Sequence, residues 1–169
     1  VKSHGGAIKV SSASGQGTVF DIYLPVVPAE EAETAKPDLP LVRGTGRVLL
    51  VDDEPGLTLL GQKILNQLGY EVLTTNSPAE ALEVFRSKPG DFDLVIPDLT
   101  MPELTGTQLA KKLLEIRPGL PVILCTGFGD QVNEGMLKAA GIKGLLLKPL
   151  TLQEFAHAVR MAISPPGGV

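Results

Sequence analysis

The sequence predicts an α/β protein, a doubly wound parallel five-stranded sheet of (βα)5 type over residues 46–164. Short, continuous apolar runs alternate along this stretch with longer amphipathic segments. Continuous apolar runs are typical of strands covered on both faces, and their alternation with helices indicates parallel strands joined by helical crossovers. The predicted strands span 47–51, 70–75, 93–97, 121–125 and 144–147.

Helix signals fall between and after these runs. The first predicted helix begins at Pro55, because proline is favoured in the first turn of a helix. Ser77 and Thr151 each precede a Glu by three residues, a capping-box pattern that predicts the second and fifth helices. The third helix ends before Pro118, and the fourth, over 132–140, has the weakest apolar periodicity.

The residues outside this unit predict a different organisation. Apolar residues alternate along two short segments of 1–27 around a glycine-containing turn, which predicts a β-hairpin. Residues 28–45 hold clustered prolines and acids without periodicity, which is typical of a linker. Residues 165–169 form a short tail. The first residues have neither an initiator Met nor an apolar signal core, so we expect a piece cut from a longer chain.

Composition excludes several classes of function. The chain has 169 residues, of which 43% are hydrophobic, and a formal net charge of −4. Because the chain has no excess of basic residues to attract phosphates or anionic lipids, we expect no nucleic-acid partner and no membrane partner. One Cys and two His cannot build a thiolate zinc site, and a single Cys cannot form an internal disulfide, so a cytoplasmic location is expected. No apolar run is long enough to span a bilayer.

Polar side chains directly follow four of the five predicted strands. Asp52 and Asp53 follow the first strand, Asp98 the third, Thr126 the fourth and Lys148 the fifth. The carboxyl ends of parallel strands meet at the edge of the sheet where ligands bind. Carboxylates that converge there repel one another, and a hard divalent cation such as Mg²⁺ removes that conflict. Lys148 and Thr126 add a positive charge and a hydroxyl that suit a transferring phosphoryl group.

Each of these residues also has a purely structural interpretation. Asp52 or Asp53 could cap the following helix, and Thr126 and Lys148 could be ordinary turn and strand-end residues. Five such residues after four strands favour a joint functional role. Cys125 differs, because it lies inside an apolar run, and we expect a packed core side chain with no basic neighbour to lower its pKa.

Four segments together resemble the receiver domains of two-component response regulators. They are VDDEP at 51–55, DLVIPDLTMPELTG at 93–106, CTG at 125–127 and KP at 148–149. The resemblance implies a flavodoxin-like sheet with strand order 2-1-3-4-5. It also implies a cis peptide bond between Lys148 and Pro149.

The same resemblance implies roles for the polar residues. Asp98 would be the phosphoacceptor, taking a phosphoryl group from a histidine-kinase phosphodonor domain or a histidine phosphotransfer protein. Mg²⁺ would be held by Asp53, Asp98 and the backbone carbonyl of Thr100, and Asp52 would hold a water on the metal. Lys148 would pair with the phosphoryl group.

Four other positions add to the resemblance or depart from it. Thr126 would turn toward the phosphoryl group. Leu145 occupies a position that is often Phe or Tyr in the family, so the resemblance does not extend to an aromatic switch. Pro97 has no amide hydrogen to donate, and we expect the end of its strand to be less tied into the sheet. We expect the bulky Phe128 to slow hydrolysis of the acyl phosphate.

The first segment resembles another family. Residues 4–25, HGGAIKVSSASGQGTVFDIYLP, are similar to the end of the ATP-binding domain of sensor histidine kinases. Kinase tail, linker and receiver follow one another as in a hybrid sensor kinase. The upstream ATP motifs and the phosphodonor histidine segment are not in this sequence, so we expect no useful ATP binding. Since an isolated hairpin is marginal in water, we expect it to be mobile or to pack its apolar face on a neighbour.

We therefore predict a phosphoacceptor receiver domain, which phosphorylates itself on Asp98 and relays or regulates a signal, with a weak homodimer allowed. One alternative is an interaction module that works through binding alone, against which the intact Asp98, Thr126 and Lys148 count. A second is a phosphatase of the haloacid-dehalogenase type. That class places an acid Asp two residues after its nucleophile, where this sequence has Thr100.

Overall fold

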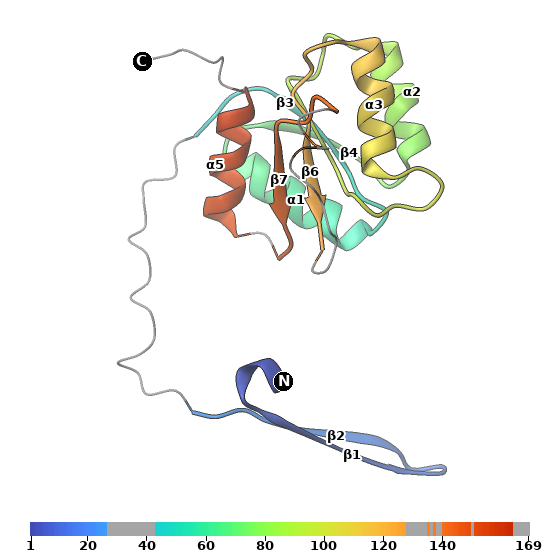
Figure 1. The fold of residues 1–169 in the computed structure, drawn as a ribbon, viewed down its shortest axis with the longest axis vertical. Helices are drawn as coiled ribbons and strands as arrows, with labels where there is room; N and C mark the ends of the chain where they lie inside the picture. Colours follow the sequence, from blue (N-terminus) through green and yellow to red (C-terminus); the bar gives the residue numbers. More distant parts are fainter. Residues whose placement is uncertain (27–42, 128–134, 136, 138–139, 150, 164–169) are drawn as a thin grey trace. The chain divides into compact units, whose positions relative to one another are not determined.

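The computed structural model describes residues 1–26, 43–127, 135, 137, 140–149 and 151–163 (Figure 1). The chain divides into two compact units, Val1–Pro40 and Leu41–Val169. Most of the predicted linker 28–45 and of the predicted helix 132–140 lies outside the described residues, as does the tail 165–169. No helix in the described part of the chain is long and apolar enough to cross a membrane.

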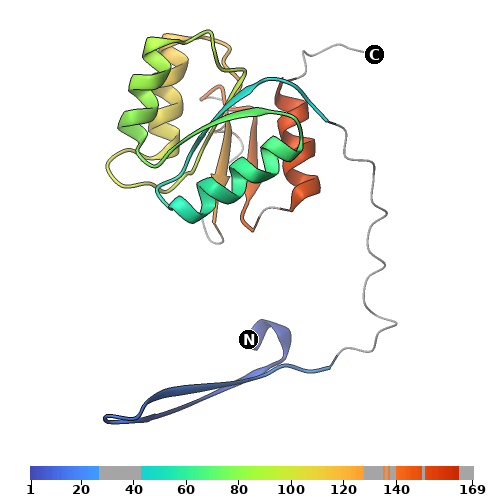
Figure 2. The ribbon, with the colours of Figure 1, turned by 180° about the vertical axis from the view of Figure 1, so that it is seen from behind.

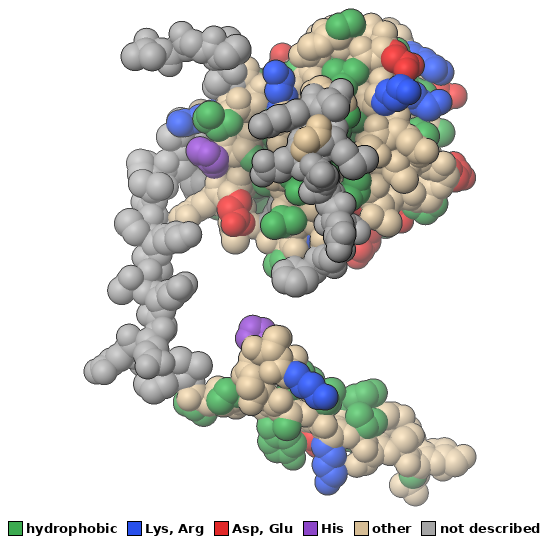
Figure 3. Space-filling view, viewed as in Figure 1, with side chains coloured by type: hydrophobic (Ala, Val, Ile, Leu, Met, Phe, Trp, Pro, Cys, Tyr) green, Lys and Arg blue, Asp and Glu red, His purple; other side chains and the backbone are tan. Residues whose placement is uncertain are grey.

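The first unit contains the predicted hairpin. Its elements are a 3-10 helix at Lys2–His4 and the antiparallel strands β1 (Ala7–Ala13) and β2 (Gly17–Tyr23). The register pairs Ile8 with Ile22 and Val10 with Phe20, so these four side chains share one face. Each is 49–61% exposed, and Figure 3 shows apolar side chains at the surface of the hairpin. The unit therefore forms a sheet with an uncovered apolar face.

The second unit contains a parallel sheet, and its strand order confirms the predicted fold class. Strand β3 pairs with β4 on one side and β5 on the other, and β6 pairs with β7. The amide of Val95 donates to Pro121 at 3.0 Å and that of Leu99 to Cys125 at 2.7 Å, which joins β5 to β6. The order is β4-β3-β5-β6-β7, the expected 2-1-3-4-5. The strands are β3 (Arg47–Val51), β4 (Glu71–Thr75), β5 (Leu94–Pro97), β6 (Ile123–Thr126) and β7 (Gly144–Leu147).

Helices cover both faces of this sheet, as the continuous apolar strands predict (Figures 1 and 2). The described helices are α1 (Pro55–Gln67), α2 (Pro78–Ser87), α3 (Gly106–Ile116) and α5 (Leu152–Ile163). Along β3, Leu49 packs in the core beneath α2 and α3, whereas Leu50 packs in the core beneath α1 and α5. Neighbouring strand residues point to opposite faces, so a strand between two helical layers must be apolar throughout.

Side-chain caps fix the starts of three helices. Thr151 and Glu154 bond reciprocally to each other's backbone amides at 3.2 and 3.3 Å, which confirms the predicted capping box of α5. Ser77 accepts a hydrogen bond from the first turn of α2 at 3.4 Å. Helix α3 has a further capping box, between Thr105 and Gln108, that the sequence analysis missed.

The strand end at Pro97 is tied regularly to β3, whereas toward β6 strand β5 has only isolated bridges at Val95 and Asp98, on either side of the proline. Pro97 pairs in register with Val51. The amide of the next residue, Asp98, donates to the Val51 carbonyl at 2.7 Å. The hydrogen bond that ties this strand end to β3 therefore comes from the residue after the proline. Toward β6 the amides of Val95 and Leu99 donate, and Pro97 between them has no hydrogen to give.

Phe155 should carry much of the stability of the α1–α5 layer, because its side chain is fully buried in that core. We expect Phe155→Ala to lower the free energy of unfolding by about 3–5 kcal/mol. Met161→Ala, on the same helix at a residue 62% exposed, should change it far less. Urea denaturation of both variants measures the difference, and equal losses would contradict this packing.

Candidate functional site

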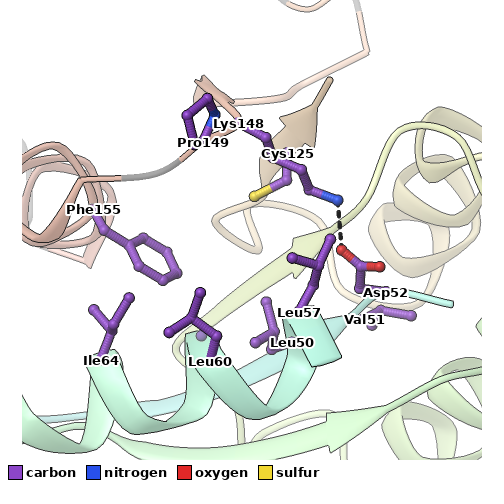
Figure 4. Close-up of a pocket in the computed structure, with 11 residues that line it drawn as sticks. Leu50, Val51, Asp52, Leu57, Leu60, Ile64, Cys125, Lys148, Pro149 and Phe155 are labelled. Carbon is purple, nitrogen blue, oxygen red and sulfur yellow. Dashed lines mark hydrogen bonds and ion pairs between the residues drawn. The ribbon is translucent and has the colours of Figure 1, made fainter. Parts of the chain in front are cut away.

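Three of the predicted site residues meet at the carboxyl edge of the sheet. Asp52 follows β3, Asp98 follows β5, and Lys148 follows β7. The Lys148 Nζ donates to Asp52 Oδ2 at 2.6 Å and also to Asp98 Oδ1. Figure 4 shows the ammonium aimed at Asp52. Both carboxylates are buried, with exposed fractions of 5% and 6%, so one cation sits between two anions that water scarcely reaches.

The backbone holds Asp98 in place. Its Oδ2 accepts a hydrogen bond from the amide of Thr100 at 2.8 Å. The start of α3 lies so close that a Cβ at Gly106 would be 2.2 Å from the Asp98 carbonyl oxygen. Only glycine fits there without movement of the backbone. Gly106 was not among the predicted site residues, although it ends the DLVIPDLTMPELTG motif.

Asp52 is fixed by a second network. Its Oδ1 accepts from the amide of Glu54 at 3.0 Å, and its carbonyl oxygen accepts from Asn76 Nδ2 at 2.7 Å. The same Asn76 nitrogen lies 3.1 Å from the hydroxyl of Thr58. Neither Asn76 nor Thr58 was among the residues predicted from the sequence. The available signal was that Asn76 directly follows β4, as the other polar residues follow their strands.

Charge pairing decides the protonation of Lys148. Burial acts to lower the pKa of its ammonium, but the hydrogen bonds and negative charges of Asp52 and Asp98 outweigh burial and raise that pKa. Lys148 therefore stays charged at neutral pH. It offsets the repulsion between two carboxylates that would otherwise face each other.

Cys125 is a buried core residue, as predicted, but it does have a basic neighbour. Burial raises the pKa of its thiol to about 12, while the charge of Lys148 acts to lower it and those of Asp98 and Asp52 act to raise it. The effect of burial on the thiol pKa is therefore larger than that of the Lys148 charge. The thiol is neutral at physiological pH and therefore a poor nucleophile.

The structure does not bring the three predicted carboxylates together. Asp53 is exposed, whereas Asp52 and Asp98 meet across Lys148. Within the described residues, no group of three or more His, Cys, Asp and Glu side chains is arranged to hold a metal ion. Thr100 is exposed, and its amide points to Asp98. The buried carboxylates of the predicted three are therefore Asp52 and Asp98, and Lys148 is their shared cation.

The remaining predicted positions lie around this pair. Thr126, at the end of β6, is fully buried, and its carbonyl oxygen accepts from the amide of Lys148 at 2.8 Å. The peptide bond between Lys148 and Pro149 is cis, as expected. Leu145 is partly buried against the core beneath α2 and α3. Phe128 lies outside the described residues.

Relatives by sequence include sensor kinases. The chain is 32% identical over 169 residues to the sensor kinase CckA of Brucella abortus, an alignment that covers 95% of this chain and 18% of that protein. It is 33% identical over 165 residues to the aerobic respiration control sensor protein ArcB of Escherichia coli, with 94% and 21% covered. The chain thus spans about a fifth of the length of these relatives.

Solved structures and a family model agree on the second unit. The receiver domain protein of Clostridium thermocellum superposes with a TM-score of 0.66 at 34% identity, covering 69% of this chain and 93% of that one. The receiver domain of the hybrid histidine kinase CckA does so with a TM-score of 0.59 at 28% identity, covering 70% and 100%. The model of the response regulator receiver domain matches residues 48–160. That match takes in more than half of the sequence, and the chain therefore belongs to the response regulator receiver domain family.

Proposed function

We propose that this domain accepts a phosphoryl group on Asp98 from a phosphohistidine and, in the cytoplasm, relays or regulates a two-component signal through the phosphorylated state. The observation that carries the proposal is the contact between the buried Asp98 carboxylate and the Lys148 ammonium. A nucleophilic carboxylate and a cation able to receive phosphoryl oxygens already lie together at the ligand-binding edge of the sheet.

The transfer uses few groups. A carboxylate oxygen of Asp98 attacks phosphorus, a P–O bond forms as the P–N bond breaks, and the imidazole leaves with the bonding electrons. Lys148 exchanges its contact with Asp98 for one with a phosphoryl oxygen. Thr126, whose strand β6 lies between β5 and β7, supplies its hydroxyl to another phosphoryl oxygen. The product is an acyl phosphate on Asp98.

The donor set at this edge suits Mg²⁺. Oxygen atoms of carboxylates and carbonyls are its preferred ligands, and it commonly keeps several waters beside one or two carboxylates. Asp53, Asp98 and the carbonyl of Thr100 would hold it, with Asp52 acting through water. When bound, the ion offsets the negative charge of the phosphoryl oxygens. An all-protein cage of three carboxylates is not needed for such a site.

Incubation with Mg²⁺ and a small phosphodonor should add one phosphoryl group to the wild-type chain, detected by intact-protein mass spectrometry. Asp98→Asn should abolish the increment, because the amide cannot act as the nucleophile. Asp91→Asn, at an exposed acid paired with Arg47, should leave it unchanged. An equal increment in Asp98→Asn, or none in wild type, would overturn the assignment.

We further propose that residues 1–27 are the end of a kinase ATP-binding domain, that 28–45 is a linker and that 46–164 is the receiver. The alignments with the sensor kinases CckA and ArcB support this, since they extend over 94–95% of the chain and so take in the hairpin. The phosphodonor would be a histidine-kinase domain or a histidine phosphotransfer protein.

The hairpin should be less stable than the sheet of the second unit, because its apolar face is uncovered. We expect the amide hydrogens of β1 and β2 to exchange well before those of β3 and β5. Hydrogen exchange followed by mass spectrometry on the whole chain measures this order. Strong protection of the hairpin in the monomer would contradict the expectation that an uncovered apolar face leaves it less stable.

A further inference from the structure

A small cavity lies between helices α1 and α5, beside the carboxyl edge of the sheet (Figure 4). Its volume is about 130 Å³. Apolar side chains form most of its lining, namely Leu50, Leu57, Leu60, Ile64, Cys125 and Phe155. Phe155 is fully buried, whereas Leu60 is 54% exposed, so the cavity meets solvent on the side of Leu60.

The size of the cavity limits what it can hold. Pockets for drug-sized ligands have volumes of about 300–1,000 Å³, so this one is too small for a nucleotide or a larger cofactor. A cavity of about 150 Å³ lined by Leu, Ile and Phe stays dry and binds benzene. The apolar residues that line this cavity are of the same kinds. Its volume and lining therefore suit one molecule of about the size of a benzene ring.

The charged groups of the lining, Asp52 and Lys148, are already paired. The Lys148 ammonium donates to Asp52 Oδ2 at 2.6 Å, and Asp52 Oδ1 accepts from the amide of Glu54 at 3.0 Å. The ammonium also donates to Asp98, which does not line the cavity. Because the two charges in the lining cancel, a charged occupant would lose its hydration and gain no opposite charge in return. The lining therefore favours an uncharged occupant.

We propose that this cavity binds one small, uncharged apolar molecule, of the size of a single aromatic ring, between α1 and α5. Burial of the apolar surface of the ligand supplies the affinity, and the affinity is modest because few atoms are buried. Binding at this site is a function in addition to phosphoryl transfer. It needs neither a phosphodonor nor a metal ion.

A first pair of variants fills the cavity from the sheet. Cys125 lies on β6 and lines the cavity, so the larger side chain of Cys125→Leu takes up part of its volume. Val122→Leu enlarges a fully buried residue in the core beneath α2 and α3, away from the cavity lining. In urea unfolding, Cys125→Leu should be at least as stable as wild type because it fills a void, whereas Val122→Leu should be less stable because it overpacks a core.

A second pair changes the wall of the cavity at the surface. Leu60 lines the cavity, whereas Leu59, 53% exposed on the same helix, does not. Leu60→Ser removes apolar surface from the lining, and Leu59→Ser removes the same surface beside it. Because both positions are exposed, both variants should fold. This pair decides the outcome if Cys125→Leu does not fold.

The probe is toluene, titrated into metal-free ¹⁵N-labelled protein and followed by amide chemical shifts. We expect saturable shifts in α1 and α5. The affinity for toluene should be at least tenfold weaker in Cys125→Leu, weaker in Leu60→Ser, and unchanged in Val122→Leu and Leu59→Ser. Benzylamine and benzoate have the same ring with a positive or a negative charge, and both should bind more weakly than toluene.

Three results would overturn the proposal. They are the absence of saturable shifts in α1 and α5, cavity variants that bind toluene as tightly as their controls, and benzylamine or benzoate binding as tightly as toluene. The titration contains no phosphodonor, so its outcome is distinguishable from failure of Asp98 phosphorylation.

Discussion

A single ammonium between two buried carboxylates organises the carboxyl edge of this sheet. Taking charges out of water is costly, and close pairing offsets that cost only when the remaining lone pairs are also satisfied. Here the carboxylates of Asp52 and Asp98 each accept one hydrogen bond from a backbone amide and one from the Lys148 ammonium. Loss of the lysine would leave two buried carboxylates without their shared cation, so the rest of the edge depends on this one interaction.

The strand order makes that interaction possible. Asp52 and Asp98 follow adjacent strands, whereas Lys148 follows β7, two places from β5 with β6 between them. The side chain of Lys148 must therefore reach across the end of β6. There the carbonyl oxygen of the buried Thr126 accepts a hydrogen bond from the backbone amide of Lys148. Residues 96 and 50 positions apart in sequence meet because of this topology. Gly106 lets helix α3 approach Asp98 closely. Asn76 holds the carbonyl of Asp52 by a hydrogen bond.

Much of this architecture could be predicted from residue patterns. The apolar runs located all five strands, and the polar residues after them located the edge at which Asp52, Asp98 and Lys148 meet. The order of the strands came only from the family resemblance, since periodicity carries no information on which strands are neighbours. Gly106 was missed because its role depends on a close contact with the Asp98 carbonyl, which lies outside its own helix and cannot be read from residue periodicity. The direct pairing of Lys148 with Asp52 and Asp98 was missed because the charge of Lys148 was assigned to the phosphoryl group and the repulsion between the carboxylates to a metal ion.

Lys148 is the counter-charge of both buried carboxylates, and we expect it to compete with an added cation for Asp98 and Asp52. The Mg²⁺ dissociation constant of wild type and Lys148→Met, measured by calorimetry, tests this most directly. Lys143→Met, which removes an exposed lysine, serves as the control. We expect Lys148→Met to bind Mg²⁺ more tightly, by about tenfold if the lost competition is worth about 1.4 kcal/mol, and Lys143→Met to match wild type. Unchanged or weaker binding in Lys148→Met would contradict the account.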